Sequence, residues 1–358
     1  MSDSNHPVVF TMTATIKDLN VAAFAMLAVL SALAFIGNAI IITIIATCKQ
    51  IRKGSRTVLV LVFNLAVSDL IFAGLSVPLT LASTTNKLDW SLGDIGCKLV
   101  MFLPNFCVAV TIFTLCVIAY DRRIAINNMA TATERKGPGV LIITSSIWIL
   151  GFVVSAPTFY EYSVYTKTVV TGAESGSSSE EVDIEMNSTV NVTSHRACGS
   201  HDIVESFEKV YATLLTLFIY ILPLIFILCN YILIFRYIWK REMELNKTRN
   251  ESRQNKRVMS SNTSRVLKML IAVIAIFTIA WAPYFFLFFR EEVTGSDDTA
   301  NFGSTLHIIK LYTAILSSVM NPLVYGLFNS HIKRGFYALV CCSAGKLTSN
   351  SVAPITNP

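Results

Sequence analysis

Apolar residues in this chain form long, almost uninterrupted runs, and polar residues gather in the segments between them. A helix needs about 20 apolar residues to cross a bilayer, because it rises about 1.5 Å per residue through a core about 30 Å thick. Seven runs reach that length, and they cover residues 21–47, 57–84, 97–120, 139–160, 210–239, 264–289 and 304–327. The pattern predicts an all-α membrane protein with a seven-transmembrane helix bundle.

A shorter element is expected directly after the seventh span. Residues 328–340 read FNSHIKRGFYALV and mix basic with apolar positions, as an amphipathic helix lying along a membrane surface does. Cys341 and Cys342 follow it. Juxtamembrane cysteines are candidates for palmitoylation, and plain buried thiols are the alternative.

Composition and charge agree with this reading and orient the bundle. Only 15% of the 358 residues are charged, against about 25% in a typical soluble protein. One side of the predicted bundle holds 21 of the 29 Lys and Arg residues, and the other holds 17 of the 23 Asp and Glu residues. Because cytoplasmic loops are rich in Lys and Arg, the N-terminus is expected outside and the C-terminus inside. The predicted parts are an extracellular N-terminus (1–20), a seven-transmembrane domain (21–342) and a cytoplasmic tail (343–358).

Two kinds of modification are expected on the outer side. Of the eight cysteines, only Cys97 and Cys198 fall in outer segments, where disulfides persist. A bridge between them is the prediction, and two free thiols are the alternative. The loop after the fourth span carries glycosylation sequons at Asn187 and Asn191, in a polar and acidic stretch where both should be accessible.

Short motifs stand in the spans in a fixed order. They are Gly37-Asn38, Asn64-Leu65-Ala66-Val67-Ser68-Asp69-Leu70, Asp121-Arg122, Trp148, Pro223 with Tyr231, Phe277-x-x-x-Trp281-Ala282-Pro283-Tyr284, and Asn321-Pro322-Leu323-Val324-Tyr325. Together they resemble the rhodopsin-like (class A) G-protein-coupled receptors over about residues 21–342, and Trp90-Ser91-Leu92-Gly93 is similar to an outer-loop pattern of neuropeptide receptors. The resemblance implies a multi-pass plasma-membrane receptor, not an enzyme, that activates heterotrimeric G proteins. Arrestin, a receptor kinase and membrane lipids are the other expected partners, and no nucleic acid is expected.

The resemblance also implies an ion site inside the bundle. A carboxylate within a span costs about 3 kcal/mol or more unless it faces the interior and finds partners. In the family, the position of Asp69 binds an allosteric sodium ion, so Asp69 is the metal candidate and no other cofactor is expected. A static polar network around a protonated Asp69 is the alternative. The expected partners are Asn38, Thr111, Ser318 and Asn321, and Ser317 stands where the family commonly has asparagine.

A switch is implied at the inner end of the third span. Arg122 would pair with Asp121 at rest and turn toward Tyr231, Tyr325 and the G protein when active, whereas a merely solvated helix end is the alternative. The family's activation connector maps to Ile112, Pro223, Phe277, Trp281 and Pro283.

Two departures from the family pattern lie near this switch. Arg123 replaces the usual tyrosine, and Thr263 stands where many relatives carry an acid that latches the arginine. Without that latch we expect a looser inactive state and measurable basal signalling.

The resemblance narrows the class of ligand that we expect. Pro104 stands where amine receptors have an aspartate, and Ile315 stands where light-sensing relatives have a lysine, so neither function is expected. The expected ligand pocket has an acidic rim over an aromatic interior; its residues are Glu205, Glu208, Glu292, Asn105, Val108, Trp281, Tyr284, Phe285, Phe288 and His307. An acidic rim attracts cations, which favours a basic or amidated neuropeptide.

Other interpretations remain open at this point. The acids can be ordinary solubilising loop residues, and the aromatics can be plain core packing. A receptor for a lipid or other small molecule, or a constitutively active orphan receptor, is the runner-up. A transporter would need charges along a path through the spans and a membrane enzyme would need a catalytic cluster, and the spans contain neither.

Overall fold

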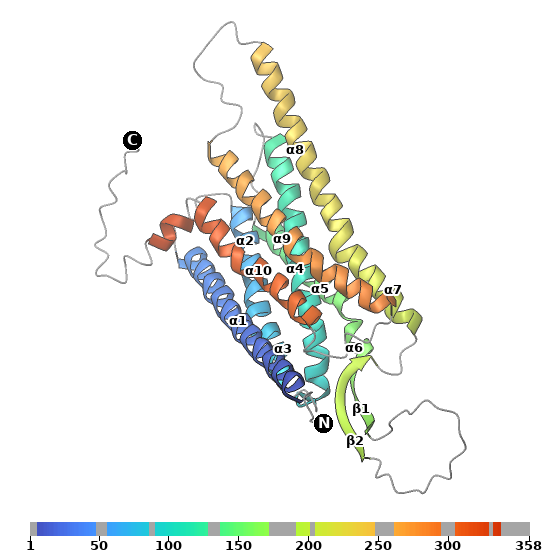
Figure 1. Ribbon diagram of the computed structural model, residues 1–358. Coiled ribbons are helices and arrows are strands. Elements are labelled where there is room, and N and C mark those ends of the chain that lie inside the picture. The colour runs from blue at the N-terminus through green and yellow to red at the C-terminus, as the bar shows by residue number, and fades with distance from the viewer. Residues whose placement is uncertain are drawn as a thin grey trace, which may run out of the picture.

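The computed structural model describes residues 6–47, 56–85, 90–127, 137–171, 191–200, 205–247, 261–294, 305–328 and 332–337. These residues form an elongated helical bundle with a β-hairpin at one end (Figure 1). The helices are α1 (His6–Thr47), α2 (Arg56–Ile71), α3 (Val77–Thr85), α4 (Gly93–Asn127), α5 (Gly137–Ser155), α6 (Thr158–Glu161), α7 (Glu205–Thr216), α8 (Leu222–Lys247), α9 (Ser261–Thr294) and α10 (Thr305–Phe328).

Seven membrane-spanning stretches are confirmed by length and composition. They run over Val21–Thr47, Thr57–Ser83, Gly93–Asn127, Gly139–Glu161, Ser206–Arg241, Leu267–Arg290 and Ile308–Phe328. The short helix expected after the seventh span is present at residues 332–337, where Ile332 is buried and Phe336 and Tyr337 are exposed. Cys341 and Cys342 lie outside the described residues.

Two of the spans contain a wider turn just before a proline. The π-helical segment η2 (Phe72–Ser76) joins α2 to α3 ahead of Pro78, and η3 (Leu217–Ile221) joins α7 to α8 ahead of Pro223. A proline has no N–H, and its ring clashes with the carbonyl four residues earlier. A π turn accommodates that ring without ending the helix, so each proline span continues across the membrane.

A two-stranded hairpin follows the fourth span, and the helical pattern did not predict it. β1 (Tyr162–Thr171) pairs antiparallel with β2 (Asn191–Ser200) along its whole length. The predicted Cys97–Cys198 disulfide is present and ties β2 to the start of α4. The Trp90 backbone N–H also donates to the Arg196 carbonyl at 2.8 Å. We call this end of the bundle the hairpin end and the opposite one the Arg122 end (Figure 1).

The α4 helix lies at the centre of the packing. In its most apolar stretch 72% of the residues are buried inside the bundle, against 22% for the span made by α5 and α6. Most of the buried apolar side chains form one continuous core, to which α4 contributes from Cys107 to Ile126. The polar groups described next lie on this central helix and its neighbours.

Candidate functional site

A buried carboxylate stands in the middle of the bundle. Asp69 on α2 is 4% exposed. Its two oxygens accept hydrogen bonds from α10: Ser318 Oγ donates to Oδ1 and Asn321 Nδ2 donates to Oδ2, each at 2.7 Å. The structure therefore brings two of the predicted partners into direct contact with Asp69.

The other predicted partners lie one step away from the carboxylate. Asn38 Nδ2 donates to the backbone oxygens of Ala34 at 2.9 Å and Ser318 at 3.1 Å. Thr111 shares a 3.2 Å hydrogen bond with Ser68. Asn38 Oδ1 and Asn321 Oδ1 are buried and have no hydrogen-bond partner among the described residues. These oxygens beside a carboxylate fit a hard cation, which prefers oxygen ligands.

An ion pair occupies the Arg122 end of α4. Arg122 Nη2 bonds Asp121 Oδ2, and the two side chains are only 15% and 13% exposed. Tyr231 on α8 lies close enough to Arg122 to interact electrostatically with its guanidinium. The hydroxyls of Tyr231 and Tyr325 are buried without a hydrogen-bond partner in the described part of the chain. Arg122 is therefore held by its neighbour in the sequence, with a buried tyrosine of α8 close to it.

Of the two positions that depart from the family pattern, the structure describes the side chain of Arg123 alone. Arg123 is held over the ring of Tyr120, with Cζ 5.2 Å from the ring centroid, in a cation–π contact. The side chain of Thr263 lies outside the described residues.

Buried aromatics connect the middle of the bundle to the hairpin end. Trp281 on α9 lies with its ring centroid 6.1 Å from that of Phe277 and 5.8 Å from that of Phe72. Ile112 and Phe277 belong to the same continuous core. Pro223 is the second residue of α8, and its carbonyl accepts a 3.8 Å contact from Cys116 Sγ on α4. Pro283 lies inside α9, so the predicted connector residues are all placed along the interior.

The predicted ligand-binding residues gather above Trp281. Tyr284 donates a 3.4 Å hydrogen bond to Asn105 Oδ1 on α4, and its ring centroid lies 5.2 Å from Trp281, 5.5 Å from Phe285 and 6.4 Å from Phe288. Val108 is buried below Asn105. Glu208 lies on α7 and is partly exposed. The side chains of Glu205, Glu292 and His307 lie outside the described part of the chain.

Two buried ionisable residues were missed from the sequence. Besides Asp69, the buried acidic or basic side chains among the described residues are Glu161, 2% exposed at the end of α6, and Lys310, 7% exposed on α10. Glu161 lies one residue past the predicted end of the fourth span and therefore counted as a loop acid. Lys310 lies within the seventh predicted span, five residues before Ile315. The signal that could have identified Glu161 is the proline at 157, which permits one more helical turn.

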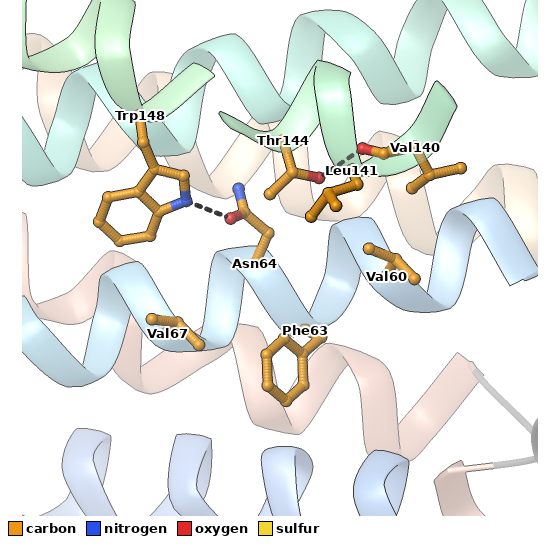
Figure 2. A pocket seen from close by; sticks show the side chains of 8 residues that line it. All are labelled: Val60, Phe63, Asn64, Val67, Val140, Leu141, Thr144 and Trp148. Carbon is orange, nitrogen blue, oxygen red and sulfur yellow. Dashed lines mark hydrogen bonds between the residues drawn. The ribbon is translucent and has the colours of Figure 1, made fainter. Parts of the chain in front are cut away.

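A separate cavity of about 390 Å³ lies between α2 and α5. Figure 2 shows its lining, which comprises Val60, Phe63, Asn64, Val67, Val140, Leu141, Thr144 and Trp148. The polar groups here are already engaged. Trp148 Nε1 donates to Asn64 Oδ1 at 2.7 Å, and Thr144 donates to the Val140 carbonyl (Figure 2). Asn64 Nδ2 donates to Thr114 Oγ1 on α4 at 2.7 Å. The lining offers no anchor for a charged ligand.

Comparison with known proteins agrees with this geometry. The family model described as "7 transmembrane receptor (rhodopsin family)" matches residues 37–325. The chain is similar to the tachykinin-like peptides receptor 86C of Drosophila melanogaster, 27% identical over 88% of this chain and 58% of that protein. It is also similar to bombesin receptor subtype-3 of Ovis aries (26% identical; 91% of this chain, 76% of that protein) and to a QRFP-like peptide receptor of Branchiostoma floridae (25%; 90% and 78%).

Proposed function

Because the chain belongs to the rhodopsin family of seven-transmembrane receptors, we propose that it binds an extracellular neuropeptide and activates heterotrimeric G proteins. The observation that carries this proposal is the part-buried Asp121–Arg122 pair at the inner end of α4, in a chain that matches the receptor family from residue 37 to residue 325. The family is one of signalling receptors in the plasma membrane, not of enzymes.

The orientation follows from the basic residues. We place the hairpin end outside, because the segments joining the spans at the Arg122 end hold most of the Lys and Arg residues. A disulfide at the hairpin end also suits the oxidising side of a membrane. Asn187 and Asn191 are then extracellular glycosylation sites, and Cys341 and Cys342 are cytoplasmic palmitoylation sites.

The ligand is proposed to be a basic or amidated peptide. Relatives whose names state a peptide ligand support the class. The residues above Trp281 combine aromatic rings with the polar Asn105–Tyr284 pair, which suits an aromatic or amide-bearing peptide end better than a wholly apolar lipid. The acidic residues predicted at the rim, Glu205, Glu208 and Glu292, would draw a cationic peptide toward the bundle.

Signalling is proposed to work by a shift between two packings of the helices. In the resting packing Arg122 is held by Asp121. In the active packing Arg122 would leave that partner, meet the hydroxyls of Tyr231 and Tyr325, and contact the G protein. Asp69, Ser318 and Asn321, with the free oxygen of Asn38, would hold a sodium ion in the resting packing. The ion adds a positive charge that stabilises this packing.

Two further partners are proposed from family membership. An active receptor of this kind presents its cytoplasmic loops and tail to a receptor kinase and then to arrestin. The basic residues of the segment between the fifth and sixth spans would also meet anionic membrane lipids.

The test is a G-protein dissociation assay in cells expressing the chain, across several Gα classes, with a pool of basic, C-terminally amidated peptides. A concentration-dependent response that the Arg122→Ala variant lacks, at equal surface expression, is expected. A receptor that reaches the surface and stays silent to every peptide, but responds to a lipid pool, would refute the peptide assignment.

A further inference from the structure

Two contacts from residues 90–94 cover the outer edges of the β-hairpin at its base. On the β1 edge, the Val164 backbone N–H donates to Asp94 Oδ1 at 3.2 Å. On the β2 edge, the Arg196 carbonyl accepts from the Trp90 backbone N–H at 2.8 Å. The backbone groups of a strand edge are therefore engaged where the hairpin meets the bundle.

The register of the hairpin shows which further residues of β1 face outward. Val164 gives its N–H to Asp94, so the pair Val164–Cys198 is one whose backbone groups point away from each other. Such pairs alternate with hydrogen-bonded pairs along an antiparallel ladder. Thr166 lies opposite Arg196, whose carbonyl also points outward. Thr166 and Thr168 therefore direct their backbone N–H and C=O groups away from β2.

These two threonines form a free stretch of strand edge. Thr166, Lys167 and Thr168 are all exposed, and within the described residues the outward backbone groups of Thr166 and Thr168 have no hydrogen-bond partner. The hairpin extends here from α6 away from the helices (Figure 1). An exposed strand edge is a template for pairing with a further strand, and peptide-binding domains use such edges to hold an extended peptide by its backbone.

The chain that joins the two strands has a charge that suits a basic peptide. Residues 172–190 contain five acidic residues and no Lys or Arg, whereas the two strands together contain one Lys and one Arg. This excess of negative charge attracts a cation to the hairpin. Asn191, a proposed glycosylation site, is the first residue of β2. A glycan there would crowd the β2 edge and leave the β1 edge accessible.

We propose that an extended segment of the basic peptide ligand pairs as a third strand with the β1 edge at Thr166 and Thr168. Each threonine offers one N–H and one C=O to the peptide backbone, so this contact does not depend on the side chains of the peptide. The inference rests on the proposed peptide function and adds a second contact region to it. The residues above Trp281 would bind one end of the peptide, and the β1 edge would bind the backbone of a segment outside the bundle.

The experiment uses peptides in which single backbone amides are blocked. A library of C-terminally amidated decapeptides, each with two or more basic residues, is screened by G-protein dissociation, and each active peptide is remade with one N-methylated amide at a time. Every second residue of an added strand turns its N–H toward the receptor. Along the paired segment we expect potency on the wild type to fall about fivefold or more at every second residue, the loss typical of a missing hydrogen bond. Methylation at the residues between should change potency less than about twofold.

Proline substitutions identify the edge. The double variant Thr166→Pro, Thr168→Pro removes two outward N–H groups and keeps the hydrogen bonds between β1 and β2, because proline is tolerated where the N–H of an edge strand faces solvent. The alternation should disappear on this variant. The matched control is Ser194→Pro, which lies opposite Thr168 and faces outward on the β2 edge; the alternation should persist on it.

Three results would contradict the proposals, and they are distinguishable. Active peptides without any alternation on the wild type would overturn the strand pairing while leaving the peptide function intact, whether or not the proline variants reach the surface. Alternation that is lost on Ser194→Pro, or that survives on the double variant, would overturn the assignment to the β1 edge. A wild type that no basic peptide of the library activates would refute the proposed peptide function itself.

Discussion

At the scale of single residues, neighbouring side chains reduce the free-energy cost of burying charge in this bundle. The Asp69 carboxylate accepts one hydrogen bond on each oxygen from α10, and hydrogen bonds to a charged group contribute about 1.5–3 kcal/mol each. Arg122 has its carboxylate partner next to it in the sequence. The Asp69 hydrogen bonds join α2 to α10, whereas the Asp121–Arg122 pair lies within α4. Only at Asp69 does the group that neutralises the buried charge also hold two helices together.

Replacing Asp69 with asparagine is predicted to abolish the effect of sodium on receptor stability. Sodium at about ten times its dissociation constant would stabilise the wild type by about 1.4 kcal/mol, which raises its melting temperature. The amide introduced by Asp69→Asn lacks the negative charge and would present a donor to Asn321 Nδ2, so the ion affinity is lost. The measurement is the melting temperature of the detergent-solubilised receptor in sodium chloride and in choline chloride. A wild type that melts equally in both salts would contradict the ion site.

Arg123 at the inner end of α4 also makes a contact that the sequence alone did not indicate. It is held over Tyr120, a residue that is 38% exposed, so the contact contributes about 0.5–1 kcal/mol. The charge introduced where the family has tyrosine is thereby directed to the flank of α4, beside the Asp121–Arg122 pair.

At the scale of helices, one hydrogen bond joins α9 to the fifth span close to the Pro283 hinge. The Tyr220 hydroxyl donates to the Thr278 carbonyl at 2.9 Å, and its ring stacks on Phe285 with centroids 4.8 Å apart. Pro283 has no N–H for the carbonyl four residues earlier, so α9 is weakened one residue beyond Thr278. The contact holds α9 against the fifth span at the point where α9 can bend.

The Tyr220→Phe variant is therefore predicted to raise basal signalling about two- to threefold. Hydrogen bonds between membrane helices contribute about 0.6 kcal/mol on average, and that loss shifts a two-state equilibrium by about that factor. The matched control is Tyr312→Phe, which removes a tyrosine hydroxyl that bonds the Ala23 carbonyl on α1 instead. Agonist-free G-protein dissociation at equal surface density measures the effect. Equal basal activity in wild type and Tyr220→Phe would show that this bond does not restrain α9.

Asn64 is predicted to stabilise the receptor without taking part in signalling. It joins three spans, since it donates to Thr114 on α4 and accepts from Trp148 on α5. Asn64→Leu leaves the Trp148 N–H buried and unpaired, so we expect a loss of about 1–3 kcal/mol and a clearly lower melting temperature. The control Thr144→Val loses only a bond within α5 and should melt near the wild type. An Asn64→Leu receptor as stable as the control would contradict this role.

The sequence was sufficient to predict elements whose structure depends on local composition. It was insufficient where contacts between residues far apart in the sequence determine the structure. The spans followed from the length of their apolar runs. A kink and a π turn both relieve the clash that a proline causes in a helix, so only the structure shows that π turns precede Pro78 and Pro223. The β1–β2 hairpin contacts Trp90 and Cys97, which lie far away in the sequence, and such long-range contacts cannot be inferred from local composition. Glu161 was not predicted to be buried, because the fourth span was predicted to end at residue 160 and the helix α6 ends at residue 161.

At the scale of the whole molecule, the uneven distribution of charge matches the shape of the bundle. Most acidic residues lie in the segments of the hairpin end and most basic residues in those of the Arg122 end, where α8 projects beyond its neighbours (Figure 1). A basic inner surface is attracted by the anionic cytoplasmic leaflet at about 1 kcal/mol per residue near the membrane. An acidic outer surface attracts a basic peptide. In the proposed orientation, the same asymmetry would serve membrane insertion, ligand capture and contact with a cytoplasmic partner.

This orientation predicts which sequons are glycosylated. Asn187 and Asn191 belong to the hairpin-end segment and should carry glycans, whereas Asn250 has a sequon in the basic segment between the fifth and sixth spans and should not. On gels, Asn187→Gln and Asn191→Gln should each run faster by one glycan, and Asn250→Gln should run as the wild type does. An N-terminal epitope tag should be stained on intact cells, and a C-terminal tag only after permeabilisation. Glycan loss in Asn250→Gln, or a C-terminal tag stained on intact cells, would reverse the bundle and place the Asp121–Arg122 pair outside, where no G protein could reach it.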